Sequence, residues 1–290
     1  LFKAAQTIAN QFPGMSFIEE FRNISSGVLL MPSIDNYLHA HSDKQARVEL
    51  GKLLIAYSLL ISEKDSKLKF NPDNIYEKFY FANVEGTWLV ALFRSLVAAG
   101  RLEQLADWLQ RITFVSFNYD RVIHRFFFLA TQVVFDLSEE EAYRFCEENL
   151  TVLYPYGSLG RVKPTNRNSG FGQIENPQML ISAANNLRVF TEGGEDQIRQ
   201  SVHQSILDAE SVWYLGFSFL HLNMEYLKPT EQTSFRVFGT LRGVSNYNSE
   251  IAKNDIASCI ENGSSYSPGF NLVSTNCAQL IYDFSGFFQK

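Results

Sequence analysis

Four short apolar segments alternate with helical segments between residues 111 and 240, and this alternation constrains the fold more than any other feature. Each segment is rich in β-branched or aromatic residues and ends at a polar or glycine-containing turn. The segments are residues 112–117, 151–154, 211–215 and 235–238. Buried strands that alternate with helices predict βαβ units and a parallel sheet. The expected fold class is α/β: a parallel sheet with helices on its faces, behind a helical region.

The first 110 residues have helical periodicity instead. Apolar residues recur at helical spacing over residues 34–61, where Ser33 or Asp35 is the expected N-cap. They recur again over residues 85–110, where Gly100 interrupts the pattern. We therefore expect a mainly helical region at residues 1–110 and an α/β core at residues 111–290.

Further helices and loops are expected along the rest of the chain. Ser138 and Glu141 have the spacing of a capping box, so a helix should begin there. A turn is expected at residues 71–73 and a polar loop at residues 161–176. The other expected helices are residues 121–135, 195–208, 249–259 and 277–288.

Composition excludes several classes of protein. The formal net charge of −6 and a pI near 5.5 argue against a phosphate-binding basic surface, so no direct nucleic-acid partner is expected. Three scattered cysteines form no disulfide framework or zinc motif, and a reducing cytoplasm fits them best. The longest apolar run, residues 53–61, is far shorter than the roughly 18–20 residues of a membrane span, so no membrane partner is expected.

Each of the four strands is followed by residues that suit a ligand site. In parallel sheets, ligands bind beyond the carboxyl ends of the strands. Each turn also has a plain structural interpretation, as a helix cap at Asn118 or Asp120, or as a glycine turn or loop at the other three. The four groups are Asn118-Tyr119-Asp120, Tyr156-Gly157-Ser158, Gly216-Phe217-Ser218 and Gly239-Thr240.

The five histidines do not indicate a metal site. His39 and His41 are two residues apart and cannot share a helical face. His124 follows Asp120 by one helical turn and is either a structural residue or a group that approaches the site. His221 closely follows the Gly216 turn and is the stronger functional candidate. No Walker A, G-x-S-x-G or G-x-G-x-x-G motif is present.

The order and spacing of these turns resemble the sirtuin-like family. A strand ending in N-Y-D is followed by a glycine-serine turn, then by W-Y-L-G-F-S-F, then by a strand ending in G-T. Within that family, the sequence is most similar to bacterial sirtuin-like domains that hydrolyse NAD in antiphage defence. The resemblance covers residues 111–243 directly, and its most specific part is Asn118-Tyr119-Asp120.

The resemblance implies a Rossmann-like, NAD-binding core at residues 111–290, with helices on both faces of its parallel sheet. By the same resemblance, residues 1–110 would be the remainder of a first βα unit and a helical region inserted before the second half of the sheet. The resemblance also implies a set of roles. Asn118 would contact the nicotinamide ribose or the attacking water, with Asp120 supporting it, while Tyr156 or His221 would complete the catalytic group. The cofactor-binding residues implied are Tyr119, Gly157, Ser158, Gly216, Phe217, Ser218, Gly239 and Thr240. The implied reaction releases nicotinamide and leaves ADP-ribose, and its oxocarbenium-like transition state needs dipoles and a nearby carboxylate rather than a general acid. A homo-oligomer or a partner defence protein is the expected assembly.

Two departures from the family pattern keep a second hypothesis open. Tyr156 stands where the family usually has a histidine base, and a phenol with a reference pKa near ~10 is a poor base at neutral pH. The family's glycine-rich phosphate loop is not in this sequence, and because the chain begins at Leu1 inside a helical pattern, we expect the loop upstream. His124 or His221 could replace the missing base. Alternatively, the chain is an inactive module that binds NAD or ADP-ribose as a sensor or scaffold. A deacylating sirtuin is disfavoured, since three cysteines cannot form its four-cysteine zinc module.

Overall fold

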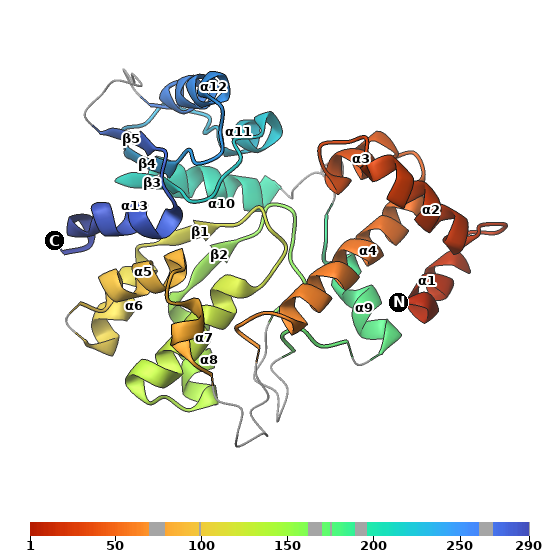
Figure 1. Ribbon diagram of the computed structural model, residues 1–290, viewed down its shortest axis with the longest axis horizontal. Coiled ribbons are helices and arrows are strands. Elements are labelled where there is room, and N and C mark those ends of the chain that lie inside the picture. Colours follow the sequence, from red (N-terminus) through yellow and green to blue (C-terminus); the bar gives the residue numbers. More distant parts are fainter. Residues whose placement is uncertain are drawn as a thin grey trace. The chain divides into compact units, whose positions relative to one another are not determined.

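The computed structural model describes residues 1–69, 79–98, 100–161, 170–174, 176–188, 196–260 and 269–289. Within these residues the architecture is mixed α/β, with many helices and two small sheets (Figure 1). The strands are β1 (Thr113–Val115), β2 (Thr151–Leu153), β3 (Ser211–Tyr214), β4 (Arg236–Thr240) and β5 (Phe270–Val273). The α-helices are α1 (Phe2–Ala9), α2 (Phe17–Val28), α3 (Ile34–Ala40), α4 (Gln45–Lys64), α5 (Trp88–Leu96), α6 (Leu102–Gln110), α7 (Val122–Phe135), α8 (Glu139–Asn149), α9 (Pro177–Asn185), α10 (Asp196–Leu207), α11 (His221–Leu227), α12 (Asn246–Ala257) and α13 (Cys277–Asp283). Two 3₁₀-helices, η1 (Phe81–Val84) and η3 (Ser285–Gln289), complete the described elements.

The chain forms two compact units, each assembled from separate stretches of sequence. Unit 1 comprises Leu1–Phe79, Val115–Glu148 and Tyr154–Asp196, and unit 2 comprises Tyr80–Phe114, Asn149–Leu153 and Gln197–Lys290. These are not the consecutive ranges 1–110 and 111–290 that we expected from the change in sequence pattern. Periodicity reports the local element type, whereas the units depend on contacts between elements distant in sequence.

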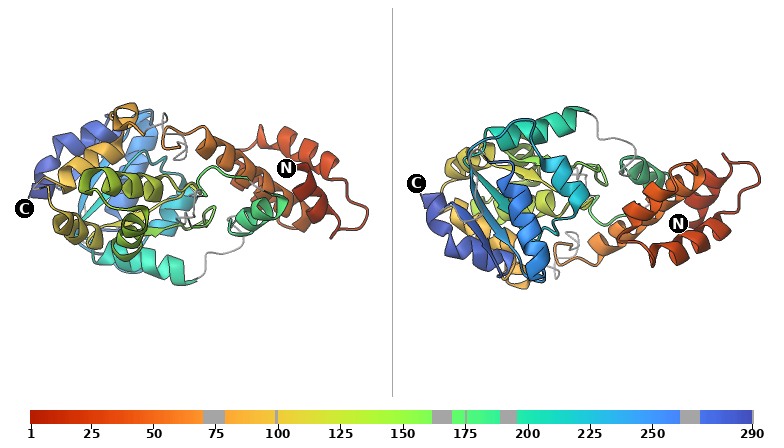
Figure 2. Two further views of the ribbon diagram at one scale, coloured as in Figure 1. Left: turned by 90° about the horizontal axis from the view of Figure 1, so that it is seen from below. Right: turned by 90° about the horizontal axis from the view of Figure 1, so that it is seen from above.

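Helix α4 is the centre of the N-terminal part of unit 1. Buried residues lie on most of its circumference, which is the pattern of a helix covered by neighbours on several sides. Helices α1, α2 and α9 pack against it, as two views show (Figure 1 and Figure 2). Gly51 allows the side chain of Leu38 in α3 to contact the α4 main chain, because a Cβ at this position would overlap with Leu38.

The second part of unit 1 contains α7 and most of α8. Phe126 and Phe127 in α7 are almost fully buried, which confirms the prediction that this aromatic run forms core. The predicted capping box is also confirmed: the Glu141 main-chain N–H donates to Ser138 Oγ over 3.3 Å, and the Ser138 N–H donates to Glu141 Oε2 over 2.9 Å. The reciprocal bonds satisfy two donors that a helix start leaves open.

Unit 2 contains a parallel three-stranded sheet in the order β3-β4-β5. Trp213 pairs with Phe238 in the register of β3 and β4, and their rings stack with centroids 4.3 Å apart. Phe284, Phe287 and Phe288 surround this pair from the C-terminal end of the chain. A large share of the aromatic residues in unit 2 therefore serves to bury one face of this small sheet.

Several boundaries differ from those expected. Residues 34–61 form two helices, α3 and α4, and the N-cap of α3 is Ser33, whose Oγ accepts from the Asn36 N–H over 3.1 Å. The break at Gly100 is confirmed, since α5 and α6 lie on either side of it. Gly239 and Thr240 lie inside β4, so our interpretation of them as a loop was wrong. Strand β5 and helices α9 and α11 were not predicted. The turn expected at 71–73 and most of the 161–176 loop lie outside the described residues.

Candidate functional site in unit 1

The segment from Asn118 to Arg121 follows β1 and leads into α7, and its four side chains have different environments. Asn118 is exposed, Asp120 is half-buried, and Tyr119 and Arg121 are buried. Alternating directions of this kind are expected where a strand turns sharply into a helix. The segment can therefore anchor itself through two residues and present the other two.

Tyr119 anchors the segment in the helical core of unit 1. Its hydroxyl donates to Asp35 Oδ1 in the first turn of α3 and lies 3.4 Å from the Arg188 carbonyl oxygen. Its own carbonyl oxygen accepts from the Leu159 N–H over 3.1 Å. Burial raises the pKa of Asp35, and the hydrogen bond from Tyr119 opposes that increase. The structure thus places Tyr119, which the resemblance implied as a cofactor contact, among core residues of unit 1.

Asp120 lies directly before the N-cap residue of α7, which is Arg121 and has no side-chain cap. The Oδ1 atom of Asp120 accepts from the Val122 N–H over 3.0 Å, two residues along the chain, as in an Asx-turn. Neither of the two caps expected from the sequence, Asn118 or Asp120, is therefore the N-cap of α7. Burial raises the pKa of Asp120, and the negative charge of Glu63 adds to the increase. Asn118 is left exposed beside it, and its carbonyl oxygen accepts from Ser116 Oγ over 3.3 Å.

His124 lies one turn after Asp120 and forms a pair with Tyr154. The His124 Nδ1 atom is 3.3 Å from Tyr154 Oη, and the two rings are stacked with centroids 6.1 Å apart. Burial, with the positive charges of Arg161 and Arg121, lowers the pKa of His124 to about 4. Burial and the charge of Asp120 raise the pKa of Tyr154. At neutral pH both rings are therefore uncharged, and Nδ1 can accept from the tyrosine hydroxyl when the imidazole proton is on Nε2.

The turn after β2 is fixed by a close approach between main chains. Gly157 has φ of +78°, and a Cβ there would collide with the carbonyl oxygen of Asn186. The Arg188 N–H donates to the Tyr156 carbonyl oxygen over 2.8 Å, and the Tyr156 ring meets Phe117 edge-on at 5.6 Å. Ser158 Oγ accepts from the Gly160 N–H over 3.3 Å. Every one of these contacts is structural, so the plain interpretation of this turn as a left-handed glycine turn is confirmed.

The remaining candidate residues lie in unit 2, at the carboxyl ends of β3 and β4. The Gly216 N–H donates to Thr240 Oγ1 over 3.1 Å, so the two strand ends meet as a parallel pair requires. Gly216 has φ of +61°, and a Cβ there would lie 3.6 Å from Cys277 Sγ. Gly239 is held between Tyr214 and Leu272, where a side chain would overlap with both.

The other residues of this group differ in exposure. Phe217 packs against Tyr214 with ring centroids 5.7 Å apart, while Ser218 is exposed. His221 begins α11 and is exposed, with its Nε2 atom 3.4 Å from Glu225 Oε1. The candidate residues therefore form two groups, one in each unit: Asn118, Tyr119, Asp120, Tyr156, Gly157 and Ser158 in unit 1, and Gly216, Phe217, Ser218, His221, Gly239 and Thr240 in unit 2.

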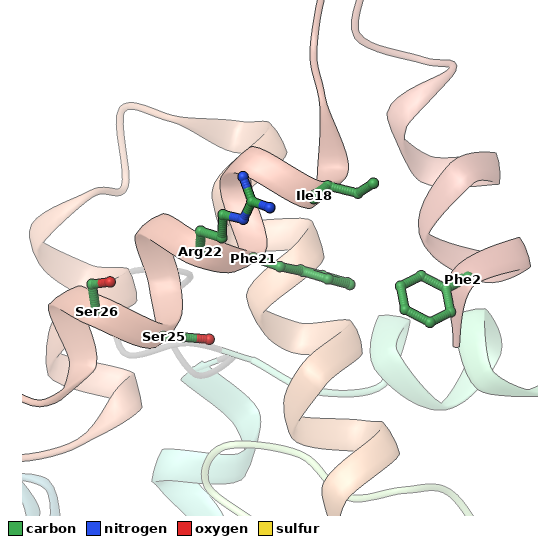
Figure 3. Close-up of a pocket in the computed structure, with 6 residues that line it drawn as sticks. All are labelled: Phe2, Ile18, Phe21, Arg22, Ser25 and Ser26. Atoms are coloured by element: carbon green, nitrogen blue, oxygen red, sulfur yellow. The ribbon is translucent and has the colours of Figure 1, made fainter.

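A separate hollow of about 340 Å³ lies beside α1 and α2 in unit 1. Phe2, Phe21 and Ile18 line it together with Arg22 and two serines (Figure 3). None of the candidate residues lines it, and it holds no pair of titratable groups. Within the described residues, no three His, Cys, Asp or Glu side chains gather in an arrangement that could hold a metal ion.

Sequence reasoning missed three residues of the unit 1 site, namely Tyr154, Glu63 and Asp35. Tyr154 follows β2 and stands directly before the turn that was singled out, so its position was a usable signal. Glu63 and Asp35 lie in the helical region, and nothing in the sequence connects them with a motif more than fifty residues later.

Comparisons of the chain with protein-family models, with curated proteins and with solved structures found no match. In the part of the chain that the structure describes, no helix has both the length and the apolar composition needed to cross a bilayer.

Proposed function

We propose that the chain is an NAD-binding, sirtuin-like domain that hydrolyses NAD to nicotinamide and ADP-ribose. The observation that carries the proposal is the group of titratable side chains around Asp120. A carboxyl group with a raised pKa, an imidazole with a strongly lowered pKa and a buried tyrosine lie together where a strand ends and a helix begins. Perturbed pKa values of this kind cluster at functional sites.

The proposed reaction needs a carboxylate more than it needs a strong acid. The bond between the ribose C1′ and the pyridinium nitrogen breaks, and its electron pair neutralises the nicotinamide as it leaves. Water then forms the new bond to C1′ and loses one proton, so NAD and water become ADP-ribose, nicotinamide and a proton. Positive charge develops on the ribose, and the carboxylate of Asp120 would stabilise it.

The other roles follow from the environments of the side chains. Asn118 is exposed next to Asp120, and its amide would orient the ribose hydroxyls or the water. His124 is uncharged at neutral pH. With its proton on Nδ1 and donated to Tyr154 Oη, its Nε2 would be free to take up the proton of the attacking water more readily than a tyrosine could. In this assignment His124 replaces Tyr156, whose ring packs against Phe117. His221, in unit 2, is the alternative base.

Unit 2 supports the nucleotide part of the proposal independently. Its strands are parallel, and Gly216, Ser218 and Thr240 lie at or after the carboxyl ends of β3 and β4. Strand ends of this type are the ligand-binding edge in Rossmann-like sheets. By the resemblance, these residues would contact the adenosine side of NAD. The same proposal extends to a Rossmann-like core, a cytoplasmic role in bacterial antiphage defence, and assembly as a homo-oligomer or with a partner defence protein.

A second function, binding of NAD or ADP-ribose without turnover, is favoured by Tyr156. No histidine occupies that turn, and a pKa of about 4 makes His124 a weak base. A binding module of this kind would retain the strand-end groups and lack the step at C1′.

Nicotinamide release from NAD by the purified protein tests the proposal. Asn118→Ala should reduce the release, whereas Asn248→Ala, an exposed asparagine on α12, should not. Equal release by all three proteins would remove Asn118 from the site. An NAD-dependent rise in melting temperature with no release of nicotinamide would establish the second function. The absence of both nicotinamide release and a melting-temperature shift would refute both functions.

A further inference from the structure

A buried ion pair holds the residue that follows Asp120. Glu63, near the end of α4, accepts from the Arg121 main-chain N–H over 3.2 Å and from Nε over 3.0 Å, both on Oε1. Its Oε2 accepts from Arg121 Nη2, with which it forms a salt bridge. The two side chains are 2% and 6% exposed. Ion pairs with this degree of burial and this number of hydrogen bonds differ from the exposed pairs elsewhere in the protein.

The same carboxylate also fixes a glycine-containing segment. Glu63 Oε2 accepts from the Gly172 N–H over 2.9 Å, and Arg121 Nη2 donates to the Gly170 carbonyl oxygen over 2.8 Å. Gly172 has φ of +66°, and a Cβ there would lie 2.7 Å from the Glu63 carbonyl carbon. Phe171 between them is fully buried. The Glu63–Arg121 pair is thus the junction of three segments: the end of α4, residues 170–172 and the start of α7.

This junction bears directly on Asp120. The Arg121 N–H that Glu63 accepts belongs to the peptide group that joins Asp120 to Arg121, so the acceptor fixes the main chain at the carboxyl side of Asp120. The described hydrogen bonds of the guanidinium go to Glu63 and Gly170, and none goes to Asp120. Without Glu63, a buried cation would stand one residue from a half-buried carboxylate.

We infer that Glu63 is a positioning residue for Asp120, which holds the peptide group of Asp120–Arg121 in place and keeps the Arg121 guanidinium paired away from the Asp120 carboxyl group. The inference rests on the proposed function, because it gives Glu63 a role only if Asp120 has one. It goes beyond that function by placing a determinant of the site in α4, within the helical region.

A purely structural pair makes different predictions. If Glu63 and Arg121 only join segments, their loss should lower stability, and the pKa of Asp120 should shift only by the charges removed, so that the shifts in the two single variants add to the shift in a variant lacking both. If Glu63 positions Asp120, the shifts should not add, because the guanidinium that is left unpaired in Glu63→Gln alone can approach the Asp120 carboxyl group. Glu63→Gln removes a negative charge and leaves Arg121 unpaired, so the pKa of Asp120 should fall. Arg121→Met leaves Glu63 unpaired, so the pKa of Asp120 should rise.

The groups that face Asp120 are few enough for the shifts to be interpretable. In the part of the chain that the structure describes, the charged or titratable groups around it are Glu63 on α4, Arg121 and His124 at the start of α7, and Tyr154 after β2, with Arg161 beside His124. Carbon-13 NMR of protein labelled at aspartate carboxyl groups follows the titration, and Asp120→Asn identifies the signal. Glu20→Gln is the matched control, since Glu20 forms a partly buried pair with Arg47 and contributes nothing to the pKa of Asp120.

A double variant keeps the inference testable if the single variants do not fold. Removing one member of a buried pair is strongly destabilising, whereas replacing both by apolar residues is often neutral. Glu63→Met with Arg121→Met should therefore fold, yet we expect nicotinamide release at least tenfold below that of the unchanged protein. Unchanged release by the folded double variant would overturn the inference.

The two proposals fail in distinguishable ways. If the unchanged protein does not release nicotinamide but the Asp120 pKa shifts of the single variants do not add to that of the double variant, the proposed reaction is wrong and the positioning role stands. If the protein releases nicotinamide and these shifts simply add, the positioning role is wrong.

Discussion

Replacing Gly157 by alanine tests the geometry of the turn after β2. Two separate costs are expected. An alanine held at φ of +78° loses about 1–2 kcal/mol relative to glycine, because its Cβ approaches the following carbonyl oxygen. The new Cβ would also displace the Asn186 carbonyl group, and with it the 2.8 Å hydrogen bond from the Arg188 N–H to the Tyr156 carbonyl oxygen, at about 0.5–1.5 kcal/mol. The expected total loss of unfolding free energy is about 1.5–3.5 kcal/mol.

Gly14→Ala separates the two costs. Gly14 also has φ of +78° and also lies in unit 1, but a Cβ there meets nothing within 4 Å. It should therefore show the conformational cost alone, about 1–2 kcal/mol. Any excess in Gly157→Ala measures the collision with Asn186.

Urea unfolding followed by far-UV circular dichroism gives both values. Trp88, Trp108 and Trp213, the three tryptophans of the chain, belong to unit 2, so their fluorescence reports that unit by itself. We expect the fluorescence transition to stay in place in both variants if the units unfold separately. Equal losses of stability in Gly157→Ala and Gly14→Ala would refute the close approach of the two main chains at this turn.

Three further predictions concern unit 1. The pKa of His124 is about 4 in the folded protein and 6.5 in the unfolded chain, so the folded protein binds fewer protons between these two pH values. The contribution of His124 to the free energy of unfolding should therefore be fully present above pH 6.5 and fall by about 3 kcal/mol as the pH drops to 4. Asp35 and Asp120 change the free energy of unfolding in the opposite direction, so the pH dependence measured for His124→Gln is subtracted from that of the unchanged protein. Identical curves of unfolding free energy against pH for the two proteins would contradict the prediction. Phe127→Ala should lower the free energy of urea unfolding by about 3–5 kcal/mol, because the ring is fully buried. Phe2 is 66% exposed, so Phe2→Ala should lower it by less than about 1 kcal/mol. Tyr119→Phe should lower the free energy of unfolding by about 1–3 kcal/mol at neutral pH, because the charged Asp35 carboxylate loses its hydrogen-bond donor. Below the raised pKa of Asp35 the carboxyl group is neutral and the loss should be smaller; an equal loss at both pH values would argue against this.

The sequence predicted helices and strands well where the pattern that indicates each one involves only residues close together in the chain. The strands at β1, β2 and β3, the interruption at Gly100 and the Ser138–Glu141 capping box are all determined by residues a few positions apart. Strand β5 was missed because Phe270–Val273 is short and contains Asn271 at its centre. Residues 34–61 were merged into one helix because apolar spacing continues across the break, where His41 Nδ1 lies 2.8 Å from the Tyr37 carbonyl oxygen.

The candidate site was only partly predictable for a related reason. Asn118 and Asp120 were found because they follow a strand directly, and the hydrogen bond from the Val122 N–H to Asp120 needs only residues beside each other. Tyr119 was assigned to a ligand because sequence gives no direction for its side chain, which the packing of α3 turns into the core. Glu63 is joined to Arg121 across 58 residues of chain, so its role depends on the tertiary fold.

The release of nicotinamide from NAD by the unchanged protein and by Asp120→Asn, measured side by side, tests the central claim most directly. Asparagine retains an oxygen that can accept from the Val122 N–H, so the variant should keep the start of α7 and remain folded. It lacks the negative charge proposed to stabilise the ribose cation, and we expect the rate to fall by about 10²–10³. Release at the same rate from both proteins, or none from the unchanged protein, would contradict the assignment of this site as an NAD-hydrolysing centre.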